Sequence, residues 1–235
     1  DDQFAPLTDK IVATIKSVGG DFPKFVINTH YHGDHTGGNE NLGKGGSFVF
    51  SHHNVRERLN TGSFIAAFNM KQEAVSKDGL PVVTFSEDIS FHLNGDSVHA
   101  IHAPHAHTDG DSFIYFENAN VIHAGDLFFN GFYPFIDVTH GGSLKGMIKA
   151  VDIVLAMADD KTKIIAGHGP LGNKAQLARY RKMLWTAYDR LRKLKAQGKS
   201  AQEAAAAKPL ADLEATWGKG LFNGDRWIEI IYSGV

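Results

Sequence analysis

The chain has 235 residues, of which 43% are hydrophobic and 21% charged, and its formal net charge is −2 with the histidines neutral. This composition excludes an intrinsically disordered chain, and no stretch approaches the roughly 20 apolar residues of a membrane-spanning helix. The balanced charge argues against nucleic acid or a membrane surface as a partner.

The first third of the chain alternates helices and short strands. Apolar residues at helical spacing predict a helix over Ala5–Val18, which Gly19 and Gly20 end. Strands are predicted at Lys24–Asn28 and Ser47–Ser51, with a polar loop over Thr29–Gly38 between them and a helix over His52–Leu59 after them.

The middle of the chain is rich in short β-type runs, and helices return after it. Strands are predicted at Val82–Phe85, Ile89–Leu93, Val98–Ala103, Ser112–Phe116, Val121–Ala124 and Lys163–Ala166, with a hairpin turn at Asn94-Gly95. Helices are predicted at Leu144–Met157, from a cap at Asn173 to about Ala196, and from a cap at Asp225 through Ile231. Since no linker divides the chain, we expect a single domain over residues 1–235, of the α/β class.

Cysteine is absent, whereas there are 13 histidines. Disulfides, thiolate metal ligands and cysteine nucleophiles are therefore excluded. Any bound metal must be held by histidine, aspartate or glutamate.

The densest histidine cluster follows the strand predicted at Lys24–Asn28. There His30, His32, Asp34 and His35 form the pattern HxHxDH in a glycine-flanked loop. Three imidazoles and a carboxylate suit borderline divalent metals such as zinc, and loops at strand ends are where open α/β folds place their chemistry. Alternate residues can point one way while the last two turn toward a neighbouring position, so the loop can serve two metal ions. The alternative is a polar loop held by hydrogen bonds.

Three further residues, His107, Asp126 and His168, stand at predicted strand ends beside glycines. Glycine lets the backbone approach a crowded centre without a Cβ clash. Each residue alone is more typical of a surface position. Together, and in this order, they predict further metal ligands.

The series HxHxDH, a lone histidine, Gly-Asp and Gly-His-Gly resembles the metallo-β-lactamase superfamily from about Asp1 to His168. The resemblance implies a four-layer αββα sandwich with two zinc ions per chain at one edge of its two sheets. It assigns His30, His32 and His107 to one metal, Asp34, His35 and His168 to the second, and Asp126 to the bridging position found in glyoxalase II-like and lactonase-like members.

Several features distinguish this chain within the superfamily. Members that use a cysteine ligand are excluded, and His32 stands where flavodiiron members usually carry glutamate. Further strands normally precede the segment that matches Asp1–Gln3, so we expect homo-oligomerisation or strand exchange at this edge. Similarity to secreted lactamase-like members implies a periplasmic or secreted protein, although Asp1–Gln3 show no signal-peptide features.

The resemblance implies a hydrolase. Two zinc ions, Asp34, Asp126 and a bridging hydroxide sum to about +1, which would attract a small anionic substrate and stabilise an oxyanion. Zinc lowers the pKa of bound water from about 15.7 toward about 7, and the hydroxide would attack a carbonyl carbon. Asp34 is the predicted catalytic residue, since it can orient the hydroxide or relay a proton.

Hydrolysis of a β-lactam, or of a related cyclic amide or ester, is the predicted activity. Lactonase or glyoxalase II-like thioesterase activity is the next alternative. An iron-dependent redox protein on the same fold is the alternative from another class, whereas the lack of basic excess argues against a nuclease.

Some residues have two interpretations. His105 forms a second HxH with His107, Asp109 or Asp111 either holds a ligand histidine or caps a turn, and both Phe128–Phe135 and Gly62–Met70 either wall the substrate pocket or belong to the core. The remaining histidines are predicted to be surface or packing residues: His52, His53, His92, His99, His102, His123 and His140.

Overall fold

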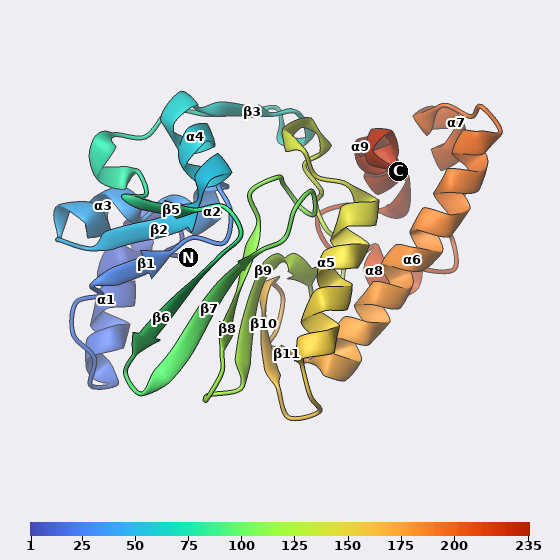
Figure 1. Ribbon diagram of the computed structural model, residues 1–235. Helices are drawn as coiled ribbons and strands as arrows, with labels where there is room; N and C mark the ends of the chain where they lie inside the picture. Colours follow the sequence, from blue (N-terminus) through green and yellow to red (C-terminus); the bar gives the residue numbers. More distant parts are fainter.

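The computed structural model describes residues 1–235 and shows two sheets packed face to face, with helices on both outer sides (Figure 1). The smaller sheet is parallel, with the strand order β1-β2-β5. Its strands are β1 (Phe25–Ile27), β2 (Phe48–His52) and β5 (Val83–Phe85). Helices α1 (Thr8–Ser17), α3 (Asn39–Lys44) and α4 (His53–Thr61) flank it. Its outer core joins Val26, Leu42 and Val49.

The larger sheet has the strand order β11-β10-β9-β8-β7-β6. Its strands are β6 (Asp88–Leu93), β7 (Asp96–His102), β8 (Ser112–Phe116), β9 (Val121–Phe129), β10 (Lys163–His168) and β11 (Gly172–Asn173). Neighbours are antiparallel except β9 and β10, which run parallel. Helices α5 (Leu144–Met157) and α6 (Lys174–Ala196) cover the face away from the small sheet (Figure 1).

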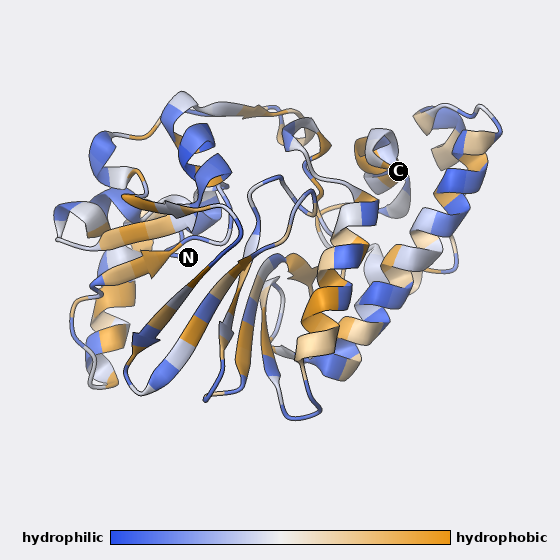
Figure 2. Ribbon diagram, in the orientation of Figure 1, coloured by the Kyte–Doolittle hydropathy of each residue, from blue (hydrophilic) through white to orange (hydrophobic).

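Apolar packing explains the layers. Phe85 of the small sheet packs with Val98, Ala100 and Ile114 of the large one, so the two sheets share a core. The largest cluster lies between the large sheet and helices α5 and α6, and Figure 2 shows α5 as strongly hydrophobic where it meets the sheet. The predicted α/β class is therefore confirmed, with the layers in the order helix, sheet, sheet, helix.

The C-terminal helices pack beside α6 and complete the molecule. They are α7 (Ala201–Ala206), α8 (Glu214–Trp217) and α9 (Gly224–Ile231). Trp227 stacks on Tyr133 with ring centroids 4.5 Å apart, and its indole N–H donates to the Pro134 carbonyl at 2.6 Å. This contact anchors the C-terminal segment to the chain that follows β9.

Most predicted elements are present, with boundaries that differ by a few residues. Strands β9 and β10 run past their predicted ends, so Asp126 lies inside β9 and His168 is the last residue of β10. The predicted loop after β1 contains a short helix, α2 (Gly33–Thr36). Asn173 caps α6 as predicted, its side chain accepting from the Gln176 N–H at 3.0 Å.

The predicted cap of the last helix is wrong. Asn223 caps α9 by accepting from the Arg226 N–H at 2.9 Å, because it stands just before the first helical residue. Asp225 lies inside the first turn and pairs with Lys208 instead.

Short elements complete the chain. The strands β3 (Ser63–Ile65) and β4 (Met70–Gln72) form a separate antiparallel hairpin. Single turns of 3-10 helix occupy Ala5–Leu7, Ala66–Phe68, Lys77–Gly79, Val138–His140 and Tyr232–Gly234. None of the helices has the length and apolar character needed to cross a lipid bilayer.

Two histidines join the two sheets at the ends of β2 and β7. The rings of His52 and His102 stack with centroids 3.7 Å apart and an interplanar angle of 7°. Burial, followed by the neighbouring His102 and His53, lowers the pKa of His52 to about 4. His52 is therefore a packing residue, and it must be neutral to occupy this position at pH 7.

This histidine pair predicts acid sensitivity. An unfolded histidine has a pKa of about 6.5, so the unfolded chain takes up a proton before native His52 does. The stability contribution of His52 is complete above pH 6.5 and is lost as the pH falls toward 4. Between pH 7 and pH 5 this amounts to about 2 kcal/mol.

The expected result is that His52→Asn, which retains a side chain able to cap α4, loses about 2 kcal/mol less than the wild type over this pH range. Urea unfolding of the metal-free proteins at both pH values measures it. The matched control is His92→Asn, since His92 is exposed on β6. Identical pH dependence in the wild type and His52→Asn would contradict the prediction.

Candidate metal centre

The seven predicted ligands converge in two adjoining groups. His30, His32, His107 and Asp126 form the first, and Asp34, His35 and His168 form the second; within each group the potential ligand atoms lie within 4.8 Å of one another. Five of the seven are buried, whereas Asp34 and His168 are half-buried. The two groups thus have a buried floor and a side open to solvent.

The three histidines of the first group turn one ring nitrogen toward a common point. Nδ1 of His32 lies 3.1 Å from Nε2 of His30 and 2.9 Å from Nε2 of His107. Their outer nitrogens all meet acceptors. Nδ1 of His107 meets the Phe135 carbonyl at 2.8 Å, and Nε2 of His32 meets Asp137 at 3.2 Å.

The outer contact of His30 follows the same rule. The Thr29 hydroxyl donates to Asp1 at 2.9 Å, so it accepts from Nδ1 of His30, which lies 3.1 Å away. With all three outer nitrogens protonated, three lone pairs face one another at the centre. Such an arrangement is repulsive unless a cation lies between them, which fits a divalent metal with imidazole ligands.

In the second group, Nδ1 of His35 contacts the Asp1 carboxylate at 2.8 Å and Nε2 points inward. Nε2 of His168 lies 3.3 Å from Asp34 and 3.4 Å from Asp126. The His168 ring stacks on Phe129, with centroids 4.9 Å apart. One aromatic contact and two carboxylates therefore hold a side chain that is otherwise accessible.

Asp126 lies between the two groups. Oδ2 is 3.3 Å from Nε2 of His107, while Oδ1 is 3.2 Å from Nε2 of His35. Asp126 Oδ1 and His35 Nε2 are both buried and face each other at this distance without a well-formed hydrogen bond. Buried polar atoms are rarely left without a partner, so these two are a further sign that a cation fits here.

Local backbone geometry places Asp126 and His168 side by side. The register between β9 and β10 shifts on both sides of Ala166, and such irregularities redirect side chains. Gly125 has a φ of +52°, and a Cβ on Gly167 would lie 2.1 Å from Asp126 Oδ1. Only glycine allows this approach, which explains the Gly-Asp and Gly-His motifs.

Ionisation differs between the two groups. Burial above all lowers the pKa of His107 to about 4 and that of His30 well below its usual value, so both rings are neutral at pH 7. Burial also opposes protonation of His35, but the Asp126 and Asp34 carboxylates outweigh it and raise its pKa to about 9. Hydrogen bonds to the same carboxylates raise the pKa of His168 to about 9. A metal entering the second group would displace these protons.

Burial would raise the pKa of Asp126, but the charges of His35 and then of His30 and His107 hold it well below its ordinary value. For Asp34, burial is likewise outweighed by hydrogen bonds from His168 and His35, which lower its pKa. Both carboxyl groups are therefore ionised at neutral pH. They supply the two negative charges expected of this ligand set.

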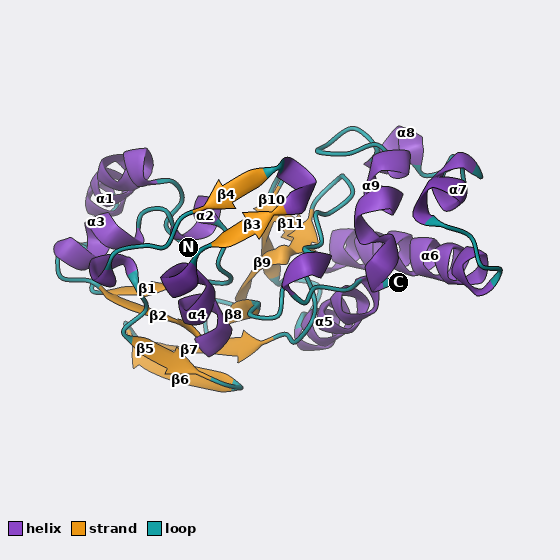
Figure 3. Ribbon diagram, turned by 90° about the horizontal axis from the view of Figure 1, so that it is seen from above, coloured by secondary structure: helices purple, strands orange, loops and turns teal.

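A cavity of about 320 Å³ lies over the open side of both groups. Its lining consists of Phe4, His32, Gly33, Asp34, Ile65, Phe68, Met70, Lys71, Gln72, Asp126, Phe129, Phe135, His168 and Leu221. Part of one wall is the β3–β4 hairpin, which Figure 3 shows crossing above β9 and β10. The Gln72 side-chain amide anchors the hairpin by donating to the Tyr31 carbonyl at 2.9 Å.

The structure decides between the two interpretations of several segments. Phe129 and Phe135 wall the cavity, whereas Phe128 and Tyr133 belong to the core. The segment Gly62–Met70 forms the hairpin and its loop rather than a core helix.

His105, Asp109 and Asp111 contact groups other than the ligand rings. The exposed His105 contacts the Gly141 carbonyl at 3.1 Å, so only His107 of this pair faces the centre. Asp109 pairs with Arg58. Asp111 accepts from the Thr108 N–H and hydroxyl at 2.7 and 2.6 Å, which is the turn-capping alternative.

The residues that do hold the ligand rings carry no local sequence signal. Asp1 contacts His35 and also His123 at 2.9 Å, and Asp137 contacts His32. His140, a predicted surface or packing residue, packs behind the ligands, where it contacts Asp137 at 2.7 Å. These residues are 34 to 122 positions from their partners along the chain, apart from His140, so spacing could not reveal them.

Comparison with known proteins agrees with this architecture. Residues 4–169 match the model of the metallo-β-lactamase superfamily. Similar solved structures include a metallo-β-lactamase from Pontibacter korlensis (21% identity, TM-score 0.58, 78% of each chain covered) and the DIM-1 metallo-β-lactamase (17%, 0.61, 79% of this chain and 80% of that one). TTHA1623 in a di-iron-bound form is also similar (24%, 0.58, 73% and 82%).

At these identities the solved structures establish the fold alone, while the family model covers most of the chain, including the seven clustered residues. The resemblance noted from the motifs is therefore confirmed. The chain belongs to the metallo-β-lactamase superfamily.

Proposed function

We propose that this protein is a zinc-dependent hydrolase that cleaves a β-lactam or a related cyclic amide or ester. The main support is that three imidazole lone pairs and the Asp126 carboxylate converge beneath a cavity that Asp34 also lines. Nitrogen and carboxylate ligands suit zinc. Two bound metal ions would supply an ionised water at neutral pH and polarise the substrate carbonyl.

Asp34 is the proposed catalytic residue of the chain. Its carboxylate is ionised, lines the cavity and contacts Nε2 of His168 at 3.3 Å. A carboxylate in this position can accept a hydrogen bond from the attacking water and hold its proton for the leaving group. No serine, threonine or cysteine nucleophile lines the cavity, so attack by water is the chemistry that its residues support.

The cavity also favours a particular substrate shape. Phe68, Met70 and Leu221 place apolar surface at its mouth, and each is more than 40% exposed. Lys71 is the one lysine or arginine that lines it. We propose a small substrate with an apolar group beside the reacting carbonyl and an anionic group that displaces Glu73 from the Lys71 ammonium, with which Glu73 forms an exposed ion pair at 2.8 Å.

An assay of purified, zinc-loaded protein tests this function. Nitrocefin, a panel of lactones and S-lactoylglutathione represent the amide, ester and thioester classes, and we expect the highest kcat/KM for nitrocefin. A higher value for a lactone or the thioester would replace the β-lactam with that class. Protein with both metals bound that hydrolyses none of the three would contradict the proposal.

The iron-dependent redox alternative is supported by one observation, the similarity to TTHA1623 in its di-iron-bound form. Against it stands the ligand set, in which imidazoles outnumber carboxylates five to two. Metal analysis of protein purified without added metal separates the two. Iron in place of zinc, with no hydrolysis after zinc exchange, would favour the redox function.

A further inference from the structure

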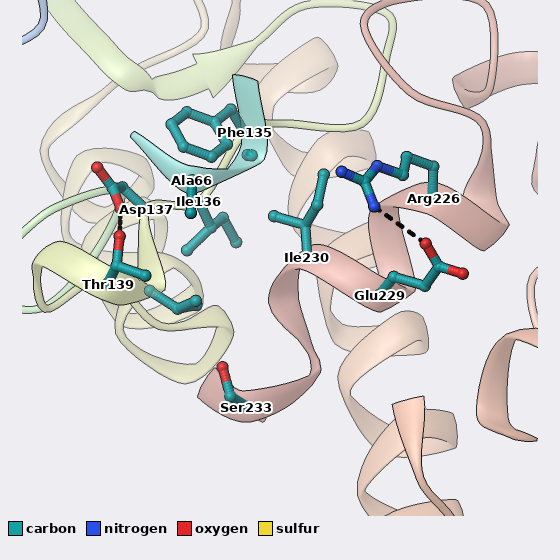
Figure 4. Close-up of a pocket in the computed structure, with 11 residues that line it drawn as sticks. Ala66, Phe135, Ile136, Asp137, Thr139, Arg226, Glu229, Ile230 and Ser233 are labelled. Atoms are coloured by element: carbon teal, nitrogen blue, oxygen red, sulfur yellow. Dashed lines mark hydrogen bonds and ion pairs between the residues drawn. The ribbon is translucent and has the colours of Figure 1, made fainter. Parts of the chain in front are cut away.

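The Asp137 carboxylate lies at the centre of a buried hydrogen-bond cluster behind the first group of ligands. The residue is 2% exposed and follows β9 in the segment Phe135–Asp137. Oδ2 of Asp137 accepts from the Tyr31 hydroxyl at 2.6 Å. The same atom lies 2.7 Å from Nδ1 of His140 and 3.2 Å from Nε2 of His32. Oδ1 accepts from the Thr139 hydroxyl at 2.6 Å, which Figure 4 shows at the edge of a second cavity.

The contact with His32 determines which nitrogen of that ring is available. Asp137 is an acceptor, so Nε2 of His32 carries the proton and Nδ1 presents its lone pair to His30 and His107. A ring turned over would present its Cδ2–H to the metal position, and a ring protonated on Nδ1 would present an N–H, so neither could bind a cation there.

The same segment holds a second histidine. The Phe135 carbonyl accepts from Nδ1 of His107, and the Asp137 N–H donates to the His107 carbonyl at 2.8 Å. The Phe135 ring lies 5.5 Å from His32 and 5.6 Å from His107, between centroids. Phe135 and Asp137 thus orient two of the three imidazoles.

Helix α4 supports the cluster from the other side. The Arg58 guanidinium pairs with Asp109, lies 5.7 Å from the centre of the Tyr31 ring and donates to the His140 carbonyl at 3.4 Å. Tyr31 and His140 are therefore held in place independently of any metal. Apart from Tyr31, His140 and Thr139, the Asp137 carboxylate contacts the His32 ring.

We propose that Asp137 is a positioning residue that sets the metal affinity of the His30, His32 and His107 site selectively. The second group lies outside its reach, because the carboxylates that contact His35 and His168 are those of Asp1, Asp34 and Asp126. The inference rests on the proposed metal centre but not on the identity of the substrate.

The test is a stepwise Co²⁺ titration of metal-free protein against a competing chelator, followed by visible absorption. For Asp137→Asn we expect affinity at the three-histidine site to fall by about 10- to 100-fold, with affinity at the second site unchanged. The number of Co²⁺ ions bound tightly by each chain would then fall from two to one. Equal losses at both sites, or no loss at either, would overturn the proposal.

Asp111→Asn is the matched control, since Asp111 is also a buried carboxylate near His107 but contacts no ligand ring. It is expected to lower Tm without changing the ratio of the two affinities. A purely structural role for Asp137 predicts that both variants behave alike.

A measurement on the wild type covers the case in which Asp137→Asn does not fold. Long-range nitrogen–proton NMR of the zinc-loaded protein reports which ring nitrogen of each histidine carries the proton. We expect His32 to be protonated on Nε2, and protonation on Nδ1 would overturn the proposal. Because these experiments read metal binding, protein that binds two metals but fails the substrate assay would refute the proposed hydrolase and leave this inference standing.

Discussion

Replacing His30 by alanine is expected to lower kcat/KM for the best substrate by about a thousandfold. His30 is fully buried and provides one of the three converging nitrogens, so its removal leaves the first metal with an incomplete set of ligands. Metal polarisation of a carbonyl contributes several kcal/mol to transition-state stabilisation, and a thousandfold corresponds to about 4 kcal/mol. Steady-state kinetics at fixed zinc concentration measures the loss.

Asp34→Ala is expected to reduce turnover by a similar factor for a different reason. Asp34 contacts both His168 and His35 and faces the cavity, so its loss weakens the second metal position and removes the proton acceptor. The matched control for both variants is His92→Ala on the exposed side of β6, where we expect wild-type kinetics. Wild-type rates in His30→Ala and Asp34→Ala, with circular dichroism unchanged, would remove both residues from the chemistry.

Removal of metal with a chelator is expected to abolish hydrolysis and to destabilise the fold. Without a cation, the lone pairs of three buried imidazoles face one another and the buried Oδ1 of Asp126 makes no well-formed hydrogen bond. A ligand at a thousand times its Kd stabilises the native state by about 4 kcal/mol, which for a chain of this size raises Tm by about 10 °C.

Thermal unfolding of chelated and zinc-reconstituted protein checks this expectation, and activity assays on the same samples follow the recovery of turnover. Chelator saturated with zinc beforehand controls for direct effects of the chelator. A chelated protein with full activity and an unchanged Tm would show that the clustered residues hold no functional metal.

Local patterns predicted the elements well where the signal lay in consecutive residues. Helix α5 and strand β8 have the predicted boundaries, since apolar periodicity and flanking turn residues are short-range properties. The predicted ends of strands β9 and β10 come too early, just before Gly125 and Gly167, because a glycine usually weakens or interrupts a strand. Here a register shift between the two strands accommodates them.

The candidate ligands can be predicted from the sequence for the same reason, since HxHxDH places four donors within six residues and glycines flank the other three. The residues that hold the ligand rings cannot be predicted in this way. A carboxylate that holds a ligand ring needs only to lie within hydrogen-bond distance of it in space. Asp109 and Asp111, the nearest in sequence to His107, pair with Arg58 and Thr108 instead.

The chemical nature of the centre is thus a property of the sequence by itself: without cysteine, only imidazole and carboxylate groups are available, and their order along the chain identifies the superfamily. The tertiary structure alone decided which nitrogen of each ring faces inward, that Asp126 lies between the two groups, and which apolar side chains surround the opening. The reason is physical. Ligand type depends on composition, whereas proton position and pocket shape depend on contacts between segments that only folding brings together.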